Sequence, residues 1–188
     1  RGEKSDPCLV GVPTHRMVRD GKNFDAAKLL ADSAPYFDIR TGGPLDGLDE
    51  SLGHAYTEGR KAGGFYTGGE TVTVMTLKDT AVMDSLLPDL SPTARQLDVN
   101  VLHTLVLERL LGIDKENMAN QVNLTYTRSL REALDDVAAG AYQCSFLLNP
   151  TRVSEIRDVA AAGEKMPQKS TYFYPKLITG LVMNEMEL

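Results

Sequence analysis

The chain has 188 residues, of which 42% are hydrophobic and 24% charged, and a formal net charge of -6. This composition is close to that of an average globular protein and argues against wholesale disorder, while the length suits one domain with a sizeable core. The acidic balance lacks the broad basic field on which non-specific nucleic-acid binding depends, so nucleic acid is not expected as a partner.

The cellular context follows from what the chain lacks. No apolar run approaches the roughly 20 residues of a membrane span, and the start "RGEKSDPC" is not a secretory signal. Cys8 and Cys144 match neither a zinc spacing nor a disulfide framework, so reduced thiols and a cytoplasmic location are expected. Because the chain starts without Met and runs almost at once into a strand-like segment, we expect residues 1–188 to be a single domain from the C-terminal half of a longer protein.

The first third of the chain combines strand and helix signals. A strand is predicted up to Pro13 and is followed by a "RDGK" turn, and Gly68-Gly69 can supply the positive φ of a hairpin turn. A double glycine could instead cradle a phosphate, but that requires a helix directly after it, and β-branched residues follow. The other predicted elements here are a helix over 25–31, a strand over 35–40, a glycine-weakened helix over 45–62 and hairpin strands over 65–67 and 71–77.

The remainder alternates between helices and strands. Ser91 and Pro92 predict a short helical turn, and Asp98 is expected to cap a longer, apolar helix that ends at Gly112. Later elements are a strand over 122–127, a helix from the Ser129/Glu132 capping box to Gly140, a strand over 141–149, a helix capped by Asn149 and begun by Pro150, and a last strand over 177–183.

This order predicts the fold class. The C-terminal β-α-β-α-β portion is typical of α/β or α+β proteins, with helices packed on a sheet and parallel neighbours joined by right-handed crossovers. The hairpin in the N-terminal portion indicates a mixed sheet.

The segment "EKMPQKSTYFYPK" (164–176) is the first candidate for a functional site. It holds one carboxylate and three lysines, a local net charge of +2 in an acidic chain, and it is long for a connection in an α/β protein. Its hydroxyl, amide and ammonium groups could bind an anion, and its tyrosines could stack on a ring. The candidates are Lys165, Gln168, Lys169, Ser170 and Thr171 for an anion or phosphate, and Tyr172 and Tyr174 for a ring.

A solvated loop whose aromatic side chains cover the edge of the core explains the same residues. The sequence leaves both interpretations open, although a plain connector does not need a tyrosine-rich run between prolines. His15 and Arg16, which follow the first predicted strand, would suit phosphate contact or proton transfer, but such pairs are common on surfaces.

Other polar residues fit structural roles better. Glu50, His54 and Glu58 have helical spacing, but without a second motif they predict no metal site, and His103 in an apolar helix is expected to be a hydrogen-bonded core histidine. No G-x-S-x-G, H-E-x-x-H, Walker or G-x-G-x-x-G motif is present, so no catalytic residue is assigned.

Four stretches together resemble a known family: "DPCLVGVPTHRMV", "LDVNVLHTLVLERLLGI", "FLLNPT" and "GEKMPQKSTYFYPKLITGLVMN". They are similar to the C-terminal half of a widespread, largely uncharacterised prokaryotic family called domain of unknown function 1015. The resemblance runs over residues 6–184, is loose over 41–69, and is most specific at "MPQKSTYFYPK". Pro13 to Arg16 and Met166 to Lys176 match the family pattern.

The resemblance implies a nucleotide-related function. Proteins of that family carry an upstream Asp-Gly-His-His-Arg-Tyr stretch similar to a signature of ParB-like nucleotide-binding domains and free-serine kinases, and this chain has no such stretch. By analogy the whole protein would use ATP or ADP with Mg²⁺ and transfer phosphate to a small hydroxy amino acid, and the isolated chain would be inactive.

We therefore expect an anion pocket formed by His15, Arg16 and the 164–176 segment, facing the N-terminal part of the same protein. The expected ligand is a small anion or nucleotide, and a homo-oligomer is compatible with the sequence. The alternative is a non-catalytic binding or scaffold module in which the lysines only solubilise the surface.

Overall fold

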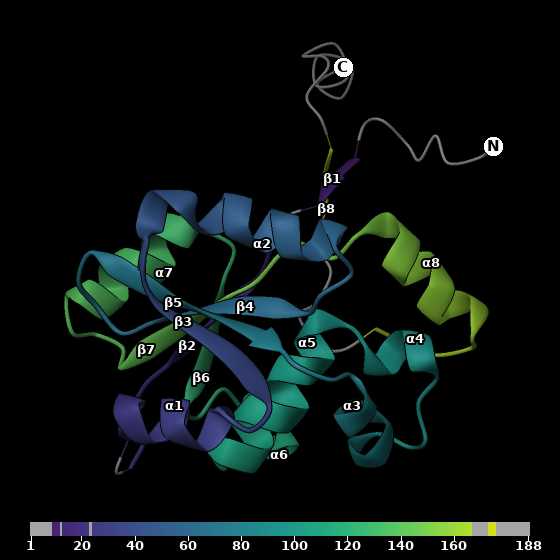
Figure 1. Ribbon diagram of the computed structural model, residues 1–188, viewed down its shortest axis with the longest axis horizontal. Coiled ribbons are helices and arrows are strands. Elements are labelled where there is room, and N and C mark those ends of the chain that lie inside the picture. The colour runs from purple at the N-terminus through teal and green to yellow at the C-terminus, as the bar shows by residue number, and fades with distance from the viewer. Residues whose placement is uncertain (1–8, 12, 23, 167–172, 176–188) are drawn as a thin grey trace, which may run out of the picture.

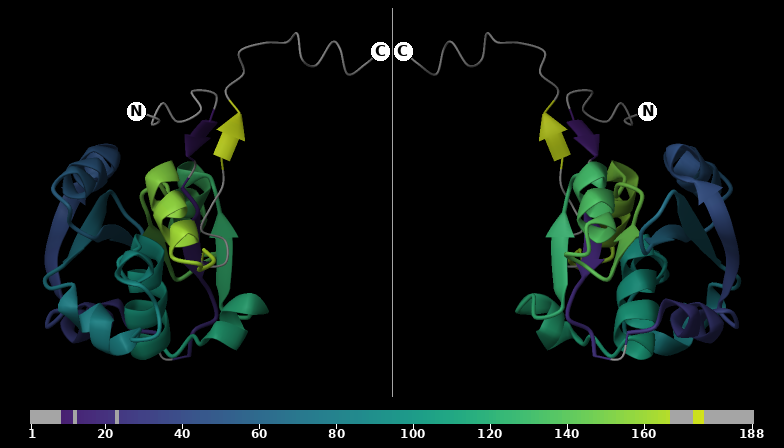
Figure 2. Two further views of the ribbon diagram at one scale, coloured as in Figure 1. Left: turned by 90° about the vertical axis from the view of Figure 1, so that its right-hand side faces the viewer. Right: turned by 90° about the vertical axis from the view of Figure 1, so that its left-hand side faces the viewer.

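The computed structural model describes residues 9–11, 13–22, 24–166 and 173–175. These residues form a six-stranded sheet with helices on both faces, and a separate two-stranded ribbon that extends away from it (Figures 1 and 2). The strands are β1 (Leu9–Gly11), β2 (His15–Val18), β3 (Phe37–Pro44), β4 (Ala62–Tyr66), β5 (Thr71–Leu77), β6 (Leu124–Thr127), β7 (Cys144–Leu147) and β8 (Phe173–Pro175). The helices are α1 (Ala26–Ser33), the 3₁₀ turn η1 (Leu45–Gly47), α2 (Leu48–Thr57), α3 (Ala81–Leu86), α4 (Pro92–Arg95), α5 (Asp98–Asn100), the π-helix η2 (Val101–Leu110), α6 (Lys115–Ala119), α7 (Leu130–Ala138) and α8 (Val153–Ala161).

The strand order of the main sheet is β3-β5-β4-β7-β2-β6, and each adjacent pair is antiparallel. The expected packing of helices on a sheet is confirmed, but the expectation of parallel neighbours is wrong. β6 and β7 do run in the same direction and are joined through α7, as the β-α-β pattern predicts. However, β2 lies between them and pairs with both, so the parallel strands are not neighbours.

The predicted hairpin is confirmed as β4 and β5, which pair from Ala62↔Thr76 to Phe65↔Thr73. Gly68 and Gly69 have φ values of 113° and 93°, which residues with a Cβ rarely adopt. The predicted strand over 177–183 lies outside the described residues.

Side chains on successive residues of each strand enter two different cores, as the alternation of a pleated strand requires. On one face, α2 and α7 cover Met17, Tyr66 and Leu147. On the other, α1 and the α5–η2 helix cover a larger core that includes Val18, Phe65 and Phe146 (Figure 1). Because the central strands are covered on both faces, their side chains are buried whether or not they are apolar.

Several helix ends follow the sequence signals. The Asp25 carboxylate accepts hydrogen bonds from the backbone N–H groups of Ala27 and Lys28, and the Ser129 hydroxyl accepts one from Glu132. The helix that starts near Asp98 continues through η2 and ends before Gly112. Gly112 has a φ of 74°, which favours glycine at a helix end. Its second part has π-type hydrogen bonds such as Leu111 N–H to Val106 C=O, at 3.0 Å.

Two predicted caps are wrong. Asp98 is the first residue inside α5, with Leu97 at the cap position, so the Asp98 carboxylate is not a cap. α8 begins at Val153, later than expected, because the Asn149 amide donates to the Leu52 carbonyl at 2.9 Å and Glu155 accepts from the N–H of Arg152 at 2.8 Å. A tertiary contact has replaced the local cap at Asn149.

Across the described ranges, no helix combines the length and the apolar character that crossing a bilayer requires.

Two glycine substitutions should change stability in opposite directions. A Cβ on Gly64 in β4 would lie 3.0 Å from Leu48 Cδ1 and 3.3 Å from Leu147 Cβ, so Gly64→Ala should lower the free energy of unfolding by about 1–3 kcal/mol. Gly53 lies inside α2, and a Cβ added there would have no atom within 4 Å. Gly53→Ala should therefore raise the free energy of unfolding by about 0.5–1 kcal/mol. Urea unfolding of both variants tests this, and a loss of stability at both positions would contradict the packing.

Candidate functional site

His15 and Arg16 follow strand β1, as the sequence predicted, and are the first two residues of β2, which lies between β7 and the edge strand β6. They are 3% and 0% exposed. Because neighbouring residues of a strand point to opposite faces, His15 shares a face with Met17, and Arg16 shares a face with Val18 and the α5–η2 helix. The expectation that His15 and Arg16 point into one pocket is therefore wrong.

Arg16 connects the sheet to η2. Its Nε donates to His103 Nε2 at 3.1 Å, its guanidinium donates to the Thr14 carbonyl, and its Cζ lies 5.0 Å from the centre of the Tyr126 ring. Burial lowers the pKa of Arg16 to about 10, an effect that Tyr126 partly offsets, so the guanidinium stays charged at neutral pH. These contacts hold the positive charge of the Arg16 guanidinium between η2 and β6.

His103 is neutral in this arrangement, because a nitrogen that accepts a hydrogen bond from arginine carries no proton. Burial and the nearby Arg16 charge lower the pKa of His103 to about 3. The predicted hydrogen bond of His103 is confirmed, but its side chain is half-buried and lines a pocket instead of lying in the core. Its partner, however, is an arginine 87 residues away in the chain.

His15 has a different set of contacts on the other face. Its Nδ1 accepts from the Leu148 N–H at 3.1 Å, so the neutral ring carries its proton on Nε2, which is buried and finds no partner among the described residues. Burial and, secondarily, Arg16 lower the pKa of His15 to about 4. This geometry holds His15 as a structural part of the β2–β7 region.

A pocket of about 290 Å³ opens beside His103 and Tyr126, the two side chains that contact the Arg16 guanidinium. This volume is near the lower end of the range for small-ligand sites. His103 and Tyr126 form its inner wall, and the Tyr126 hydroxyl is buried without a hydrogen-bond partner among the described residues. The lining is completed by the cations Lys115 and Lys165, by Glu108, by the polar Asn100 and Thr104, and by the apolar Leu87, Leu90, Ala94 and Met118.

Lys165 reaches this pocket because the residue before it is anchored. The Glu164 carboxylate accepts a hydrogen bond from the Ser91 N–H at 2.8 Å and another from the Ser91 hydroxyl. These bonds from Ser91 lower the pKa of Glu164, so it stays ionised. The start of the 164–176 segment is thus attached to α4, and Lys165 is directed to the space between α4 and η2.

Most of the other candidates in this segment, namely Gln168, Lys169, Ser170, Thr171 and Tyr172, lie outside the described residues. Tyr174 belongs to β8, which pairs antiparallel with β1 from Leu9↔Pro175 to Gly11↔Phe173 (Figure 2). The backbone of the segment therefore returns to the residues that lead into β2. Of the predicted anion ligands, the structure places Lys165 at the pocket and Arg16 directly behind its wall.

The remaining polar candidates do not form a site. His54 Nε2 lies 3.0 Å from Glu58 Oε2 on an exposed face of α2, and within the described ranges no three His, Cys, Asp or Glu side chains gather as metal ligands would. Cys144 is buried in β7, and burial raises the pKa of its thiol. A thiol of this kind is unreactive.

Sequence reasoning missed Tyr126 and Lys115. Tyr126 belongs to the predicted strand over 122–127, and the alternation of that strand places it on the same face as Leu124, which was a usable signal. Nothing near Lys115 in the sequence distinguishes it from a solvated helix residue.

Stability at acid pH should depend on His103. Its pKa in the folded chain, about 3, lies below the ordinary 6.5, so the unfolded chain binds a proton that the folded chain does not. The corresponding stability is present above pH 6.5 and is lost as the pH falls from 6.5 toward 3, by at most about 1.4 kcal/mol per pH unit. Relative to the unmutated chain, His103→Gln should therefore flatten the decline of unfolding free energy between pH 6 and 4.

Urea unfolding at a series of pH values measures this slope, and His54→Gln on the exposed face of α2 is the control for losing a histidine. An unchanged slope in His103→Gln would show that His103 does not contribute to the loss of stability at acid pH, to which His15, with its pKa lowered to about 4, also contributes.

Comparison with known proteins gives a likeness of fold. No family model and no curated protein sequence matches the chain, so the resemblance to domain of unknown function 1015 stays a prediction. Among solved structures, a conserved hypothetical protein from Pyrococcus furiosus is similar with a TM-score of 0.51 and 13% identity over 92% of this chain and 59% of that protein. Two structures of a free serine kinase in complex with AMP, one of them a mutant, have TM-scores of 0.48 and 0.49, with 11% and 12% identity over 92% of this chain and 57% of the kinase. Because their TM-scores lie below 0.5, the kinase structures support no conclusion about this chain. The chain shares its fold with the Pyrococcus protein and spans about three fifths of that protein's length.

Proposed function

We propose that the pocket between α4, η2 and β6 binds the phosphate group of a small molecule, and that this chain is the phosphate-binding part of a nucleotide-dependent, phosphotransferase-like protein. The single observation that carries the proposal is the convergence of cations on one cavity. Lys115 at the start of α6 and Lys165 in the loop after α8 line the same 290 Å³ pocket, and Arg16 lies behind its His103–Tyr126 wall.

The electrostatics of this pocket favour an anion. Among the described residues that line it, Glu108 is the one acidic side chain, against two lysines and the buried Arg16 charge. The Thr104 hydroxyl can donate to a phosphate oxygen, and the neutral His103 adds no positive charge of its own. In an acidic chain this is a local excess of positive charge.

The apolar part of the lining suits the remainder of the ligand. Leu87, Leu90 and Met118 line the same pocket as the polar groups. A small ligand with a ring and a phosphate would place its ring on these side chains and its charge on the lysines, as ligand sites with a mainly apolar lining and a few polar anchors do.

Phosphate transfer is the finer part of the proposal and is supported by the family resemblance. Catalysis of phosphoryl transfer consists largely of positioning and charge neutralisation, which lysines around a phosphate provide. Mg²⁺ would enter with ATP or ADP, since the ion is usually held by one or two carboxylates and the substrate phosphates. Transfer to a small hydroxy amino acid would need groups beyond those that line this pocket, so it belongs to the whole protein.

Removing a pocket lysine should weaken phosphate binding. Lys165→Ala and Lys115→Ala are each expected to raise the Kd for ADP by about 3- to 10-fold, because each removes one charge at a partly solvated site. Lys78→Ala, an exposed lysine at the end of β5, is the matched control and should leave the Kd unchanged. Isothermal calorimetry with ADP, AMP and inorganic phosphate at fixed ionic strength measures these values, and Lys169→Ala tests the part of the segment outside the described residues.

Equal affinities in Lys165→Ala, Lys115→Ala and the Lys78→Ala control would remove this pocket from the proposal. If neither phosphate nor a nucleotide binds to the chain or to the longer protein, the alternative of a non-catalytic binding or scaffold module is preferred.

A further inference from the structure

The contact between Arg16 and His103 decides which ring nitrogen of His103 carries the proton. An arginine side chain has N–H donors and no acceptor, so His103 Nε2, at 3.1 Å from Arg16 Nε, is the acceptor. A neutral imidazole has one donor and one acceptor nitrogen, and the partner of one nitrogen fixes the role of the other. The ring is neutral, because burial and the Arg16 charge lower the pKa of His103 to about 3. Its proton therefore lies on Nδ1.

The Nδ1–H group of His103 is a free donor on the wall of the cationic pocket. Nδ1 has no hydrogen-bond partner among the described residues, and it is not one of the buried atoms that lack a partner, so it is accessible from outside the protein. The half-buried ring lines the 290 Å³ pocket together with Lys115 and Lys165. An accessible donor on a side chain that lines the pocket can reach a ligand bound there.

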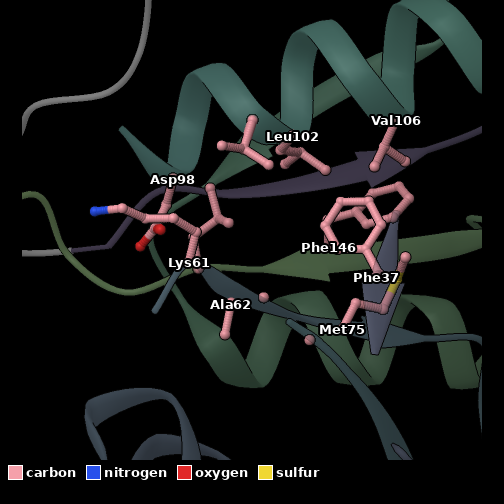
Figure 3. A pocket seen from close by; sticks show the side chains of 12 residues that line it. Phe37, Lys61, Ala62, Met75, Asp98, Leu102, Val106 and Phe146 are labelled. Atoms are coloured by element: carbon pink, nitrogen blue, oxygen red, sulfur yellow. The ribbon is translucent and has the colours of Figure 1, made fainter. Parts of the chain in front are cut away.

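The seating of the α5–η2 helix keeps His103 at this place. On another side of the helix, Leu102 and Val106 line a small apolar cavity of about 30 Å³ that ends at Asp98, and Figure 3 shows both side chains directed toward the sheet, where Phe146 lies. Successive residues of a helix point in different directions, so the side chain of His103 leaves the helix on the side of the cationic pocket. The apolar packing fixes the helix, and Arg16 fixes the ring.

His15 is the opposite case in the same chain. Its Nδ1 accepts a hydrogen bond from the Leu148 N–H at 3.1 Å, so its proton lies on Nε2. That nitrogen is buried and has no partner in the described part of the chain, so a ligand in the pocket cannot reach it. The two histidines that adjoin Arg16 thus carry their protons on different nitrogens. Of these two protonated nitrogens, the one in His103 is accessible.

We propose that His103 Nδ1–H donates a hydrogen bond to the phosphate group bound in this pocket, and that Arg16 is the positioning residue that fixes this tautomer. The inference rests on the proposed function, because it requires a phosphate in the pocket. A phosphate oxygen would then meet three kinds of donor: the ammonium groups of Lys115 and Lys165, the Thr104 hydroxyl and the imidazole N–H. Arg16 does not touch the ligand, but its hydrogen bond polarises the ring and strengthens the donor on the opposite side.

The tautomer can be measured on the unmutated protein. Long-range ¹H–¹⁵N NMR spectra of histidine-labelled protein at pH 7 separate protonated from unprotonated ring nitrogens, and the chain has three histidines. We expect the proton of His103 on Nδ1 and that of His15 on Nε2 in the same spectrum, with the signals assigned by their loss in His103→Gln and His15→Gln. A proton on Nε2 of His103 would overturn the proposal, because Arg16 could then not be its donor.

A titration with inorganic phosphate at fixed ionic strength tests the contact with the ligand. The His103 Nδ1 signal should shift and saturate with the Kd that calorimetry gives, while Nε2 stays unprotonated. The signals of the buried His15 and of the exposed His54 should not move. If phosphate binds but the His103 nitrogens do not respond, the proposal is wrong and the lysine pocket stands. If neither phosphate nor a nucleotide binds, the proposed function fails, and this inference fails with it.

Two variants separate the donor from the residue that positions it. His103→Gln can place an amide oxygen near the position of Nε2, where it still accepts from Arg16, but it has no group at the position of Nδ1. Its Kd for phosphate should rise about 10-fold, the effect of losing one hydrogen bond to a charged group, whereas His54→Gln should leave the Kd unchanged.

Arg16→Met replaces a buried charge by an apolar side chain of similar length, a change that proteins often tolerate. In this variant His103 should lose its fixed tautomer, and its ring nitrogens should show averaged signals. The Kd for phosphate should also rise about 10-fold. A His103 ring that keeps its proton on Nδ1 in Arg16→Met would show that Arg16 does not position it.

Discussion

The burial of β2 on both faces is the constraint on which the rest of this structure depends. β2 lies between β6 and β7, and each of its four residues is buried. A charged residue at such a position must find donors or acceptors inside the protein, because water cannot reach it. Arg16 finds them in His103, the Thr14 carbonyl and the face of Tyr126, which attaches the η2 helix to the sheet at this point.

The α5–η2 helix consequently serves two cavities of opposite character. Its Asn100, His103 and Thr104 face the cationic pocket, whereas Leu102 and Val106 face the apolar cavity that ends at Asp98. Both cavities therefore depend on how this helix is seated. A change in the Arg16–His103 contact would therefore affect both cavities, because residues of the same helix line them.

Parts of the site could be predicted because their signals are local. The hydrogen-bonded role of His103 follows from a histidine in an apolar helix, and the hairpin follows from two glycines between β-branched runs. The placement of Arg16 could not be predicted. The residue that stacks on it comes from β6, 110 positions later, and only the insertion of β2 between β6 and β7 brings the two together. Asp98 was misjudged for a related reason: an acidic residue before an apolar run is typical of a cap, and only the packed structure shows that Asp98 lies inside α5 and lines a cavity.

By itself, the sequence determined most element types, the hairpin turn, the Ser129 cap and the basic character of the 164–176 segment, since each depends on residues within a few positions of one another. It gave no signal for the short helices α3 and α6. The tertiary structure alone decided the antiparallel strand order, the divergence of His15 from Arg16, and the meeting of Lys115 with Lys165 at one pocket. These features join residues tens of positions apart. Their geometry is set by which strands pair and which faces the helices cover, and no local pattern carries that information.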